Sequence, residues 1–443
     1  MSAPRNPALR DSCKEFVIAS LDLMQELRSN KGYVVPLKNR WVISTNPIRV
    51  EQRPFVDFED MLREVESKIR ATPEHMALQK SLKEDYSVKG QVDRDVGTEW
   101  GQWPVTAESC STDFLLRYGQ LAGSLQFRDD VFDKFYEEFE DFFYGDEIHY
   151  RVVTPLTNMV CESELIDLGD GVRIIRLTRP LLEELMNEHF GYVGLSITDF
   201  LDIPFAIVHD YNTKKVVLQQ SSRSRAVQVT APRWQEVPLK VLSALRLLKR
   251  GVLGRAFTSY KCTQWVVHLS SGSFGVAGPT RTIGFPYELS AQDVPELQRF
   301  WNQYKLRDLE SSQPIDLVIR RFNHAQERFH TEDMLIDHIV SLEALMLPDV
   351  RQELEYRLAV RTAVLLGDSP TERLQIFKDI REAYRTRSNI IHGGLVKNSG
   401  ELLDMVDKVQ EYLRLAIRKF IGIMEMESHK RLVSQLDEQL FKP

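Results

Sequence analysis

The spacing of apolar residues predicts only helices in the last third of the chain. Apolar positions recur there every three or four residues, the period of an amphipathic helix. We expect five helices, over residues 315–329, 331–347, 351–366, 372–391 and 400–440. The start of the fourth is marked by Ser369, Pro370 and Glu372, which form a capping box with a first-turn proline, and its end by Gly393 and Gly394. Segments of this kind pack as an antiparallel bundle.

The sequence before residue 313 mixes helix and strand signals. Between residues 146 and 290, short β-branched segments alternate with helical stretches, which is typical of an α+β domain. In the first third we expect helices at residues 10–28 and 57–72 and β-rich pieces at 32–36 and 41–44. A polar loop (86–108) and a long acidic, aromatic helix (111–144) follow. The predicted fold is therefore multidomain. A mixed α/β region (1–145) and an α+β domain (146–312) precede an all-α bundle (313–443).

Composition and charge narrow the classes of function. The 443 residues are 43% hydrophobic and 27% charged, an ordinary globular balance for roughly three domains. The formal net charge of -7 provides no global positive field for nucleic acid. Any binding of phosphate must therefore rest on a local basic cluster.

Several motifs and segments are absent from the sequence. The four cysteines lie far apart without a CxxC pair, which supports neither a disulfide framework nor a zinc site. P-loop, HExxH and GxSxG motifs are missing, so we predict neither a metal nor a cofactor. No stretch reaches the length of a membrane span, and the first residues lack an apolar leader. We expect a cytoplasmic protein without membrane contact.

Three charged residues fall on the apolar faces of predicted helices. They are Glu343 in helix 331–347, Arg361 in helix 351–366 and Arg387 in helix 372–391. A buried charge is costly unless it is paired. Glu343 and Arg361 could form a structural ion pair; alternatively, Glu343 lines a site and orients its basic groups. One glutamate does not readily neutralise two arginines, so the structural explanation is weaker for Arg387.

Arg387 and His392 form an R-x4-H spacing at a helix end, and Arg385 precedes the same histidine as R-x6-H. Five residues turn a helix by about 140°, so Arg387 and His392 flank one corner of the helix end. An arginine that binds the scissile phosphate and a histidine that transfers a proton can cleave RNA without a metal. The 2′-OH attacks, leaving a 2′,3′-cyclic phosphate and a 5′-OH. The same spacing at Arg70 and His75 contains a proline and lies outside an apolar seam, so we treat it as chance.

Four sequence blocks, in this order, resemble a known family. They are RRFNHAQER (320–328), SLEALML (341–347), ELEYRLAVRTAVLLG (353–367) and YRTRSNIIHGG (384–394). These blocks are similar to successive helices of a HEPN domain of the ApeA-like type, and the resemblance covers about residues 313–443. More faintly, SALRLLKRGVLG (243–254) resembles the segment that commonly precedes this domain.

The resemblance implies a helical bundle that forms a homodimer, with the R-x4-6-H motifs of both copies in one composite cleft. Active members are metal-independent endoribonucleases of toxin–antitoxin systems and abortive antiphage defence. Arg387 and His392 match the two functional residues of the motif. Asn389, at an intervening position beside Ser388, could help to position phosphate, and Glu343 matches the acidic residue of SLEAL.

We therefore expect a cytoplasmic HEPN endoribonuclease that acts in antiphage defence or stress-triggered growth arrest on tRNA, rRNA or mRNA. The catalytic residues would be Arg387 and His392, and the supporting residues Ser388, Asn389, Arg385, Glu343 and Arg361. The alternative is a non-catalytic HEPN module that binds nucleotide or a partner protein. A less favoured reading places a separate enzyme in the α+β region.

The family resemblance implies that residues 1–312 sense a trigger, such as a phage product, or restrain the nuclease. Within them, the acidic aromatic tract 136–144 is either a packed amphipathic helix, or a surface for a basic partner or a mimic that covers the positive cleft of the nuclease. Arg223 and Arg225 form a small basic loop that is either simply solvated or guides RNA.

Overall fold

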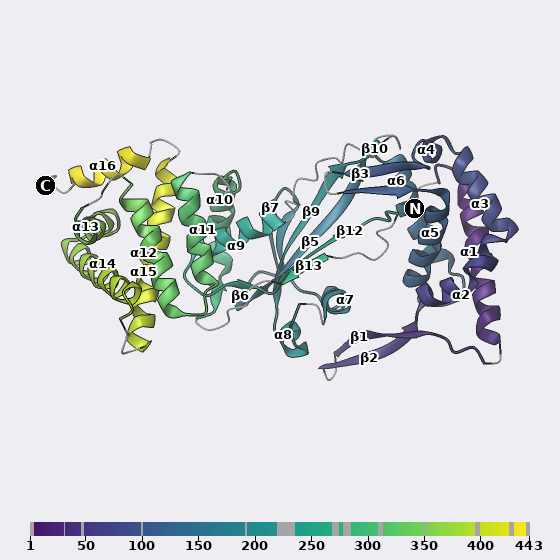
Figure 1. The fold of residues 1–443 in the computed structure, drawn as a ribbon, viewed down its shortest axis with the longest axis horizontal. Helices are drawn as coiled ribbons and strands as arrows, with labels where there is room; N and C mark the ends of the chain where they lie inside the picture. Colours follow the sequence, from purple (N-terminus) through teal and green to yellow (C-terminus); the bar gives the residue numbers. More distant parts are fainter. Residues whose placement is uncertain are drawn as a thin grey trace.

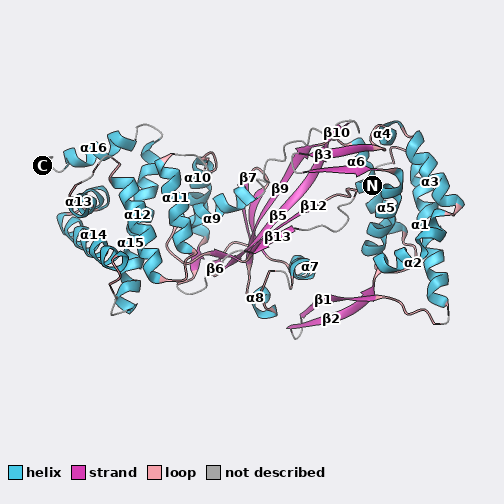
Figure 2. Cartoon of the chain, in the orientation of Figure 1, coloured by secondary structure: helices cyan, strands magenta, loops and turns pink. Residues whose placement is uncertain are grey.

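The computed structural model describes residues 4–30, 32–45, 48–98, 101–190, 193–218, 235–267, 274–277, 285–308, 313–348, 350, 352–394, 399–424 and 429–439. The molecule is elongated, with helices at both ends and a twisted sheet between them (Figures 1 and 2). An α+β region followed by C-terminal helices is the predicted layout, and it is confirmed. Arg223 and Arg225 lie outside the described residues. No described helix is long and apolar enough to cross a membrane.

The N-terminal end is a cluster of helices around an aromatic core. Its helices are α1 (Pro7–Ser29), α2 (Phe58–Arg70), α3 (Pro73–Glu84), α4 (Tyr86–Lys89), α5 (Ala107–Ala122) and α6 (Asp129–Tyr144). The predicted single helix over 111–144 is wrong, because Gly123 takes a left-handed conformation (φ 61°) and ends α5. The tract 136–144 packs inward, since Phe139, Phe142 and Phe143 are buried.

Strands are also present where we expected a loop. Residues 86–108 contain α4 and a hairpin of β3 (Arg94–Thr98) and β4 (Gly101–Val105), to which β10 (Val216–Leu218) adds a third strand. A separate antiparallel ribbon consists of β1 (Leu37–Thr45) and β2 (Ile48–Val56). The strand expected at 32–36 does not form; the ribbon begins just after it.

The central sheet has the strand order β13-β12-β5-β9-β8-β7, and every neighbouring pair is antiparallel. Its strands are β5 (Glu147–Thr157), β7 (Leu165–Gly169), β8 (Val172–Arg176), β9 (Phe205–Lys214), β12 (Phe257–Cys262) and β13 (Phe274–Ala277), and β11 (Gly254–Arg255) also pairs with β5. One face packs with α7 (Arg179–His189), α8 (Ile197–Leu201) and the ribbon. The other packs with α9 (Glu236–Leu248) and α10 (Val294–Tyr304), beside the short parallel pair β6 (Met159–Cys161) and β14 (Tyr287–Leu289).

The C-terminal helices follow the predicted series closely. They are α11 (Pro314–Gln326), α12 (Thr331–Met346), α13 (Leu354–Leu366), α14 (Pro370–Ile391), α15 (Ser399–Met424) and α16 (His429–Gln439). The prediction is wrong only for the last segment, where two helices replace the single one expected over 400–440.

One apolar core joins these helices to the sheet. The same cluster of buried side chains contains Ile207 of β9, Leu245 of α9, Tyr304 of α10 and Leu342 of α12. Polar contacts reinforce the connection, because Arg414 of α15 donates hydrogen bonds to the carbonyl oxygens of Leu247 and Leu248, both at 2.8 Å, at the end of α9. The core therefore continues across residue 312.

Candidate functional site

Helix α14 carries the candidate motif, and its sequence fixes both of its ends. The Ser369 hydroxyl accepts a hydrogen bond from the Glu372 amide (3.2 Å), and the Glu372 carboxylate accepts one from the Ser369 amide (3.1 Å). This is the capping box that the sequence predicts. At the other end His392 is the cap residue, and Gly393 follows in the left-handed region (φ 81°). The motif therefore ends at a sharply terminated helix.

Arg387 faces α12 and pairs with Glu343. Its Nη2 lies 3.5 Å from Glu343 Oε2, and both side chains are 21% exposed. Arg387 also lies over the ring of Tyr384, 5.9 Å from its centroid. Burial, and then the Glu343 carboxylate, raise the pKa of Tyr384. The Nε of Arg387 is buried without a hydrogen-bond partner in the described chain, so one donor of the guanidinium is unused.

His392 lies at the end of α14, exposed to solvent. Its amide donates a hydrogen bond to the carbonyl of Ser388 at 3.1 Å, which places the residue on the last turn. Within the described chain, no hydrogen bond or ion pair joins its imidazole to Arg387. The two residues that the motif couples in sequence are thus at one helix end but face different surroundings, as their helical offset predicts.

The intervening and flanking residues have local roles. The Asn389 side chain covers Gly394, where an added Cβ would lie 2.1 Å from Asn389 Oδ1, so a larger residue there would require the exposed Asn389 side chain to move. The side chain of Ser388 is partly buried. Arg385 Nε donates to Glu355 Oε1 of α13 at 2.9 Å. Arg385 is therefore tied to α13, whereas Arg387 is tied to α12.

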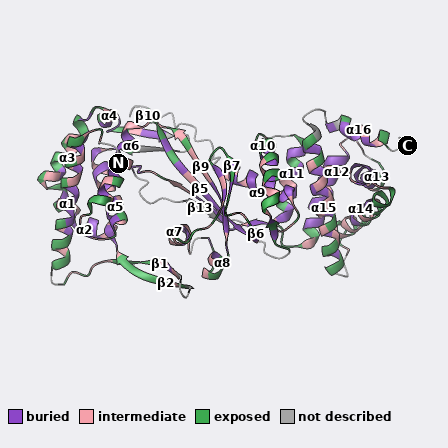
Figure 3. Cartoon of the chain, turned by 180° about the vertical axis from the view of Figure 1, so that it is seen from behind, coloured by how far each residue is buried: buried purple, intermediate pink, exposed green. Residues whose placement is uncertain are grey.

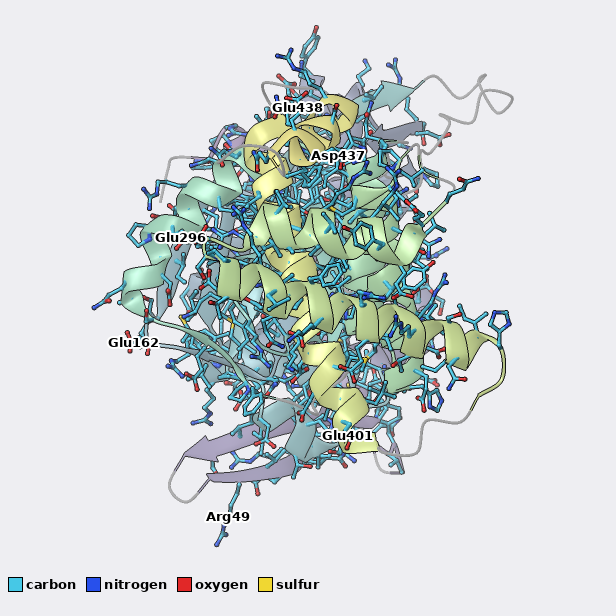
Figure 4. All side chains as sticks on the ribbon, turned by 90° about the vertical axis from the view of Figure 1, so that its left-hand side faces the viewer. Arg49, Glu162, Glu296, Glu401, Asp437 and Glu438 are labelled. Atoms are coloured by element: carbon cyan, nitrogen blue, oxygen red, sulfur yellow. The ribbon has the colours of Figure 1, made fainter. Side chains whose placement is uncertain are left out.

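Arg361 does not pair with Glu343, and that expectation is corrected. Its Nε and Nη2 donate to the two oxygens of Asp437 on α16, at 2.9 and 2.7 Å, and its Nη1 donates to the Met346 carbonyl at 2.6 Å. The Arg361 side chain is buried, and its fork-shaped pair explains why a charge is tolerated there. Asp437 can be followed in Figure 4, at the same end of the bundle as Glu438.

Sequence reasoning missed three residues that shape this region. Tyr384 lies three residues before Arg387, a spacing that places both on one helix face and could have drawn attention to it. Glu355 holds both Arg381 (2.7 Å) and Arg385, and Asp437 holds Arg361. Only contacts between helices reveal the last two.

The arrangement offers a partly exposed guanidinium and an exposed imidazole. Arginine binds phosphate through paired donors, and a solvent-exposed histidine can transfer protons near neutral pH. Among the described residues, no group of three or more His, Cys, Asp or Glu could hold a metal ion. Neither a protein-family model, nor a curated protein, nor a solved structure matches the chain.

Proposed function

We propose that the chain is a cytoplasmic, metal-independent endoribonuclease of the HEPN type, acting in antiphage defence or stress-triggered growth arrest. The observation that carries the proposal is the environment of Arg387. The guanidinium is 21% exposed, contacts a single carboxylate at 3.5 Å among the described residues, and lies five residues before an exposed histidine. This combination suits a group that receives a phosphate.

The separation of Arg387 and His392 in one chain supports a cleft formed by two copies. In a homodimer through the bundle, the histidine of one copy can face the arginine of its partner. Such an arrangement needs the α14 ends to be accessible, and Ile391 and His392 are both exposed.

The reaction follows from the two side-chain types. The 2′-oxygen of the RNA attacks the adjacent phosphorus, and its proton passes to a base. The bond from phosphorus to the 5′-oxygen breaks, and that oxygen receives a proton. His392 supplies proton transfer, and Arg387 stabilises the charge that develops on the phosphoryl oxygens. The products are a 2′,3′-cyclic phosphate and a 5′-OH, with atoms and charge conserved.

One observation favours the second candidate function, a non-catalytic module that binds nucleotide or a partner. Glu343 neutralises Arg387, which is what a purely structural arginine requires. In the nuclease, by contrast, Glu343 is a positioning residue that orients the guanidinium. The two functions differ in whether His392 is needed for any change in RNA.

The test compares wild type with His392→Ala on total RNA and a tRNA pool in EDTA, with mapping of the new ends. His330→Ala is the matched control, because His330 is also an exposed histidine at a helix end. We expect cyclic-phosphate ends with wild type and His330→Ala only. Cleavage by all three proteins, or ends without cyclic phosphate, would contradict the proposal.

The same three proteins are then expressed in cells under phage challenge, because a nuclease can require a trigger. Growth arrest and RNA cleavage that depend on His392 support the nuclease. If RNA stays intact both in the tube and in challenged cells, the non-catalytic module replaces it.

A further inference from the structure

The β1–β2 ribbon has two chemically different faces. Residues directly opposite in an antiparallel pair share a face, and successive residues alternate. One face contributes Trp41, Ile43 and Val50 to the core beside α7. The other, which we call the outer face, comprises Lys38, Arg40, Val42 and Ser44 of β1 and Arg49, Glu51, Arg53 and Phe55 of β2.

The outer face is strongly basic. It carries four cations and one anion, Glu51, in a chain whose net charge is -7. Lys38 is paired with Asp57 (2.8 Å) and Arg53 with Glu51. Arg40 and Arg49 form no ion pair with any residue that the structure describes, and Arg49 points away from the body of the protein in Figure 4. Two of the four cations are thus free to bind an external anion.

The pairing of Arg40 with Arg53 is itself unusual. The two arginines lie directly opposite each other across the ribbon. Like charges at such positions repel and destabilise a sheet. A polyanion lying along this face would offset the repulsion directly, whereas dissolved salt only screens it.

An aromatic side chain lies within the basic surface. Phe55 is opposite Lys38 and remains 38% exposed. Basic residues interleaved with an exposed aromatic ring are the combination that binds single-stranded nucleic acid, since the cations follow the phosphates and the ring stacks on a base. An acidic protein partner would account for the cations of the outer face, but it would not account for the exposed aromatic ring.

The ribbon is held in place by side chains of α7 that mimic a neighbouring strand. Asn187 accepts a hydrogen bond from the Trp41 amide (2.7 Å) and donates one to the Trp41 carbonyl (3.0 Å), and Glu183 accepts one from the Ile43 amide (2.7 Å). These bonds fix β1, so the outer face is preorganised for a ligand. Figure 3 shows the strands of the ribbon exposed on the surface.

We propose that the outer face of the ribbon binds single-stranded RNA. The ribbon and α14 lie toward opposite ends of the molecule (Figure 1), so this surface is distinct from the candidate cleavage site. That the natural ligand is RNA rests on the proposed function; that the surface binds a single-stranded polyanion does not.

The experiment measures binding of a labelled single-stranded RNA by fluorescence anisotropy over a range of salt concentrations. The full chain is used with His392→Ala, so that the RNA stays intact. Arg40→Gln/Arg49→Gln is compared with Lys80→Gln/Lys83→Gln, which removes the same charge from exposed positions of α3. Thermal unfolding of each protein verifies that it is folded.

We expect Arg40→Gln/Arg49→Gln to weaken binding at least tenfold at low salt and to lower the slope of log K against log salt by about 1.4, since each phosphate contact to a single strand contributes about 0.7. The α3 variant should bind as the parent does. Phe55→Ala should weaken binding by about tenfold at every salt concentration without a change of slope, because stacking is not an ionic contact.

Several results would overturn the proposal. They are no binding of RNA by the parent, equal affinity of the ribbon variant and the α3 variant, tighter binding of DNA of the same sequence, or binding of polyglutamate in place of RNA. Cleavage by wild type is scored separately. If the protein binds RNA through the ribbon but never cleaves it, only the nuclease proposal is wrong. If the protein cleaves RNA and binds it independently of the ribbon, only this inference is wrong.

Discussion

The carboxylate of Glu343 on α12 lies 3.5 Å from the guanidinium of Arg387 on α14, and each side chain is 21% exposed. This distance is long for an ion pair with direct hydrogen bonds, which are usually about 2.8 Å. Glu343 therefore balances the charge of Arg387 without occupying all of its donors. The same contact holds two helices together and leaves a group available for an anion.

Glu343→Gln should lower the free energy of unfolding by about 1–2 kcal/mol, between the values for exposed and buried pairs, because Arg387 loses its counter-charge. Unfolding in urea measures the change. Glu382→Gln on the exposed side of α14 is the control and should change stability by less than about 0.5 kcal/mol. In the double variant Glu343→Gln/Arg387→Gln, the cost should be smaller than the sum of the two single costs. Strict additivity would show that the two residues do not interact.

Arg387→Lys separates stabilisation from catalysis. The lysine keeps the positive charge near Glu343, but it lacks the planar pair of donors that binds phosphate. If the nuclease proposal is right, cleavage should fall about 100-fold or more while the urea midpoint stays within error. Cleavage at the wild-type rate would assign Arg387 to structure only.

His189 predicts a loss of stability in mild acid. Burial lowers its pKa to about 4, and its ring accepts or donates a hydrogen bond with the Ser259 hydroxyl at 2.8 Å. The unfolded chain has a histidine pKa of about 6.5 and binds the proton more readily. The stability that the neutral His189 side chain contributes is therefore fully present above pH 6.5. It is lost as pH falls toward 4, and the loss is about 2 kcal/mol at pH 5.

The measurement compares urea unfolding at pH 7.5 and pH 5 for wild type and His189→Gln. The variant should lose that part of the pH dependence, whereas His324→Gln, at an exposed position, should retain it. Identical pH profiles for wild type and His189→Gln would refute the assignment.

Asp437 should control the attachment of α16. The hydrogen bond from Arg361 lowers the pKa of Asp437 in the folded protein. The ionised carboxylate therefore stabilises the fold at pH values above the pKa that Asp437 has in the unfolded chain. This stabilisation is lost as the pH falls through the lower pKa of the folded state. Asp437→Asn should speed hydrogen exchange of α16 amides at pH 7 by about fivefold, the equivalent of roughly 1 kcal/mol. Glu438→Gln, the exposed neighbour, should have no effect. Unchanged exchange in Asp437→Asn would show that apolar contacts alone hold α16.

Arg246 is the buried cation at the junction of α9 and α11. It donates to the Leu253 carbonyl (3.0 Å) and to Asn323 Oδ1 (3.2 Å), and it lies 3.5 Å from Glu327. Arg246→Met should cost about 3–5 kcal/mol in urea unfolding, because Glu327 and the carbonyls lose their partner.

Two variants check that explanation. Arg250→Met removes an exposed arginine that pairs with Asp407, and it should cost less than about 1 kcal/mol. Arg246→Met/Glu327→Gln should recover part of the loss. A double variant no more stable than Arg246→Met would point to packing of the arginine stem instead.

The sequence predicted the C-terminal helices well because their signals are local. The cap of α14 at Ser369 and its end before Gly393 depend on residues within one turn, and both were identified. The sequence also locates the charges on the apolar faces, but the proposed Glu343–Arg361 pair is wrong, and Arg387, for which a structural pair was the weaker explanation, is the residue that contacts Glu343. Arg361 instead meets Asp437, from a helix 76 residues away. Pairing between helices depends on the tertiary arrangement, which spacing along one helix does not contain.

The errors in the N-terminal region have the same origin. Residues 94–105 are polar and rich in turn formers, yet they contain the strands β3 and β4, to which β10 adds a third strand from more than 110 residues away. The sequence does not indicate the break at Gly123, since acidic and aromatic residues continue the helical pattern on both sides. The basic outer face of the ribbon likewise becomes visible only with the register of β1 on β2, which places Arg40 opposite Arg53.

The continuous core has a consequence for how the protein can be divided. A fragment starting at residue 313 would expose to water the surfaces of α11 and α15 that α9 and α10 now cover, and it would leave Arg414 without the carbonyls of Leu247 and Leu248. The helices thus cannot be transplanted as an autonomous module by cutting at the end of the strand-rich sequence. A cut before α9 does not solve this, because β12 and β13 of the central sheet lie between α9 and α10 along the chain, so the bundle and the sheet can be exchanged only together.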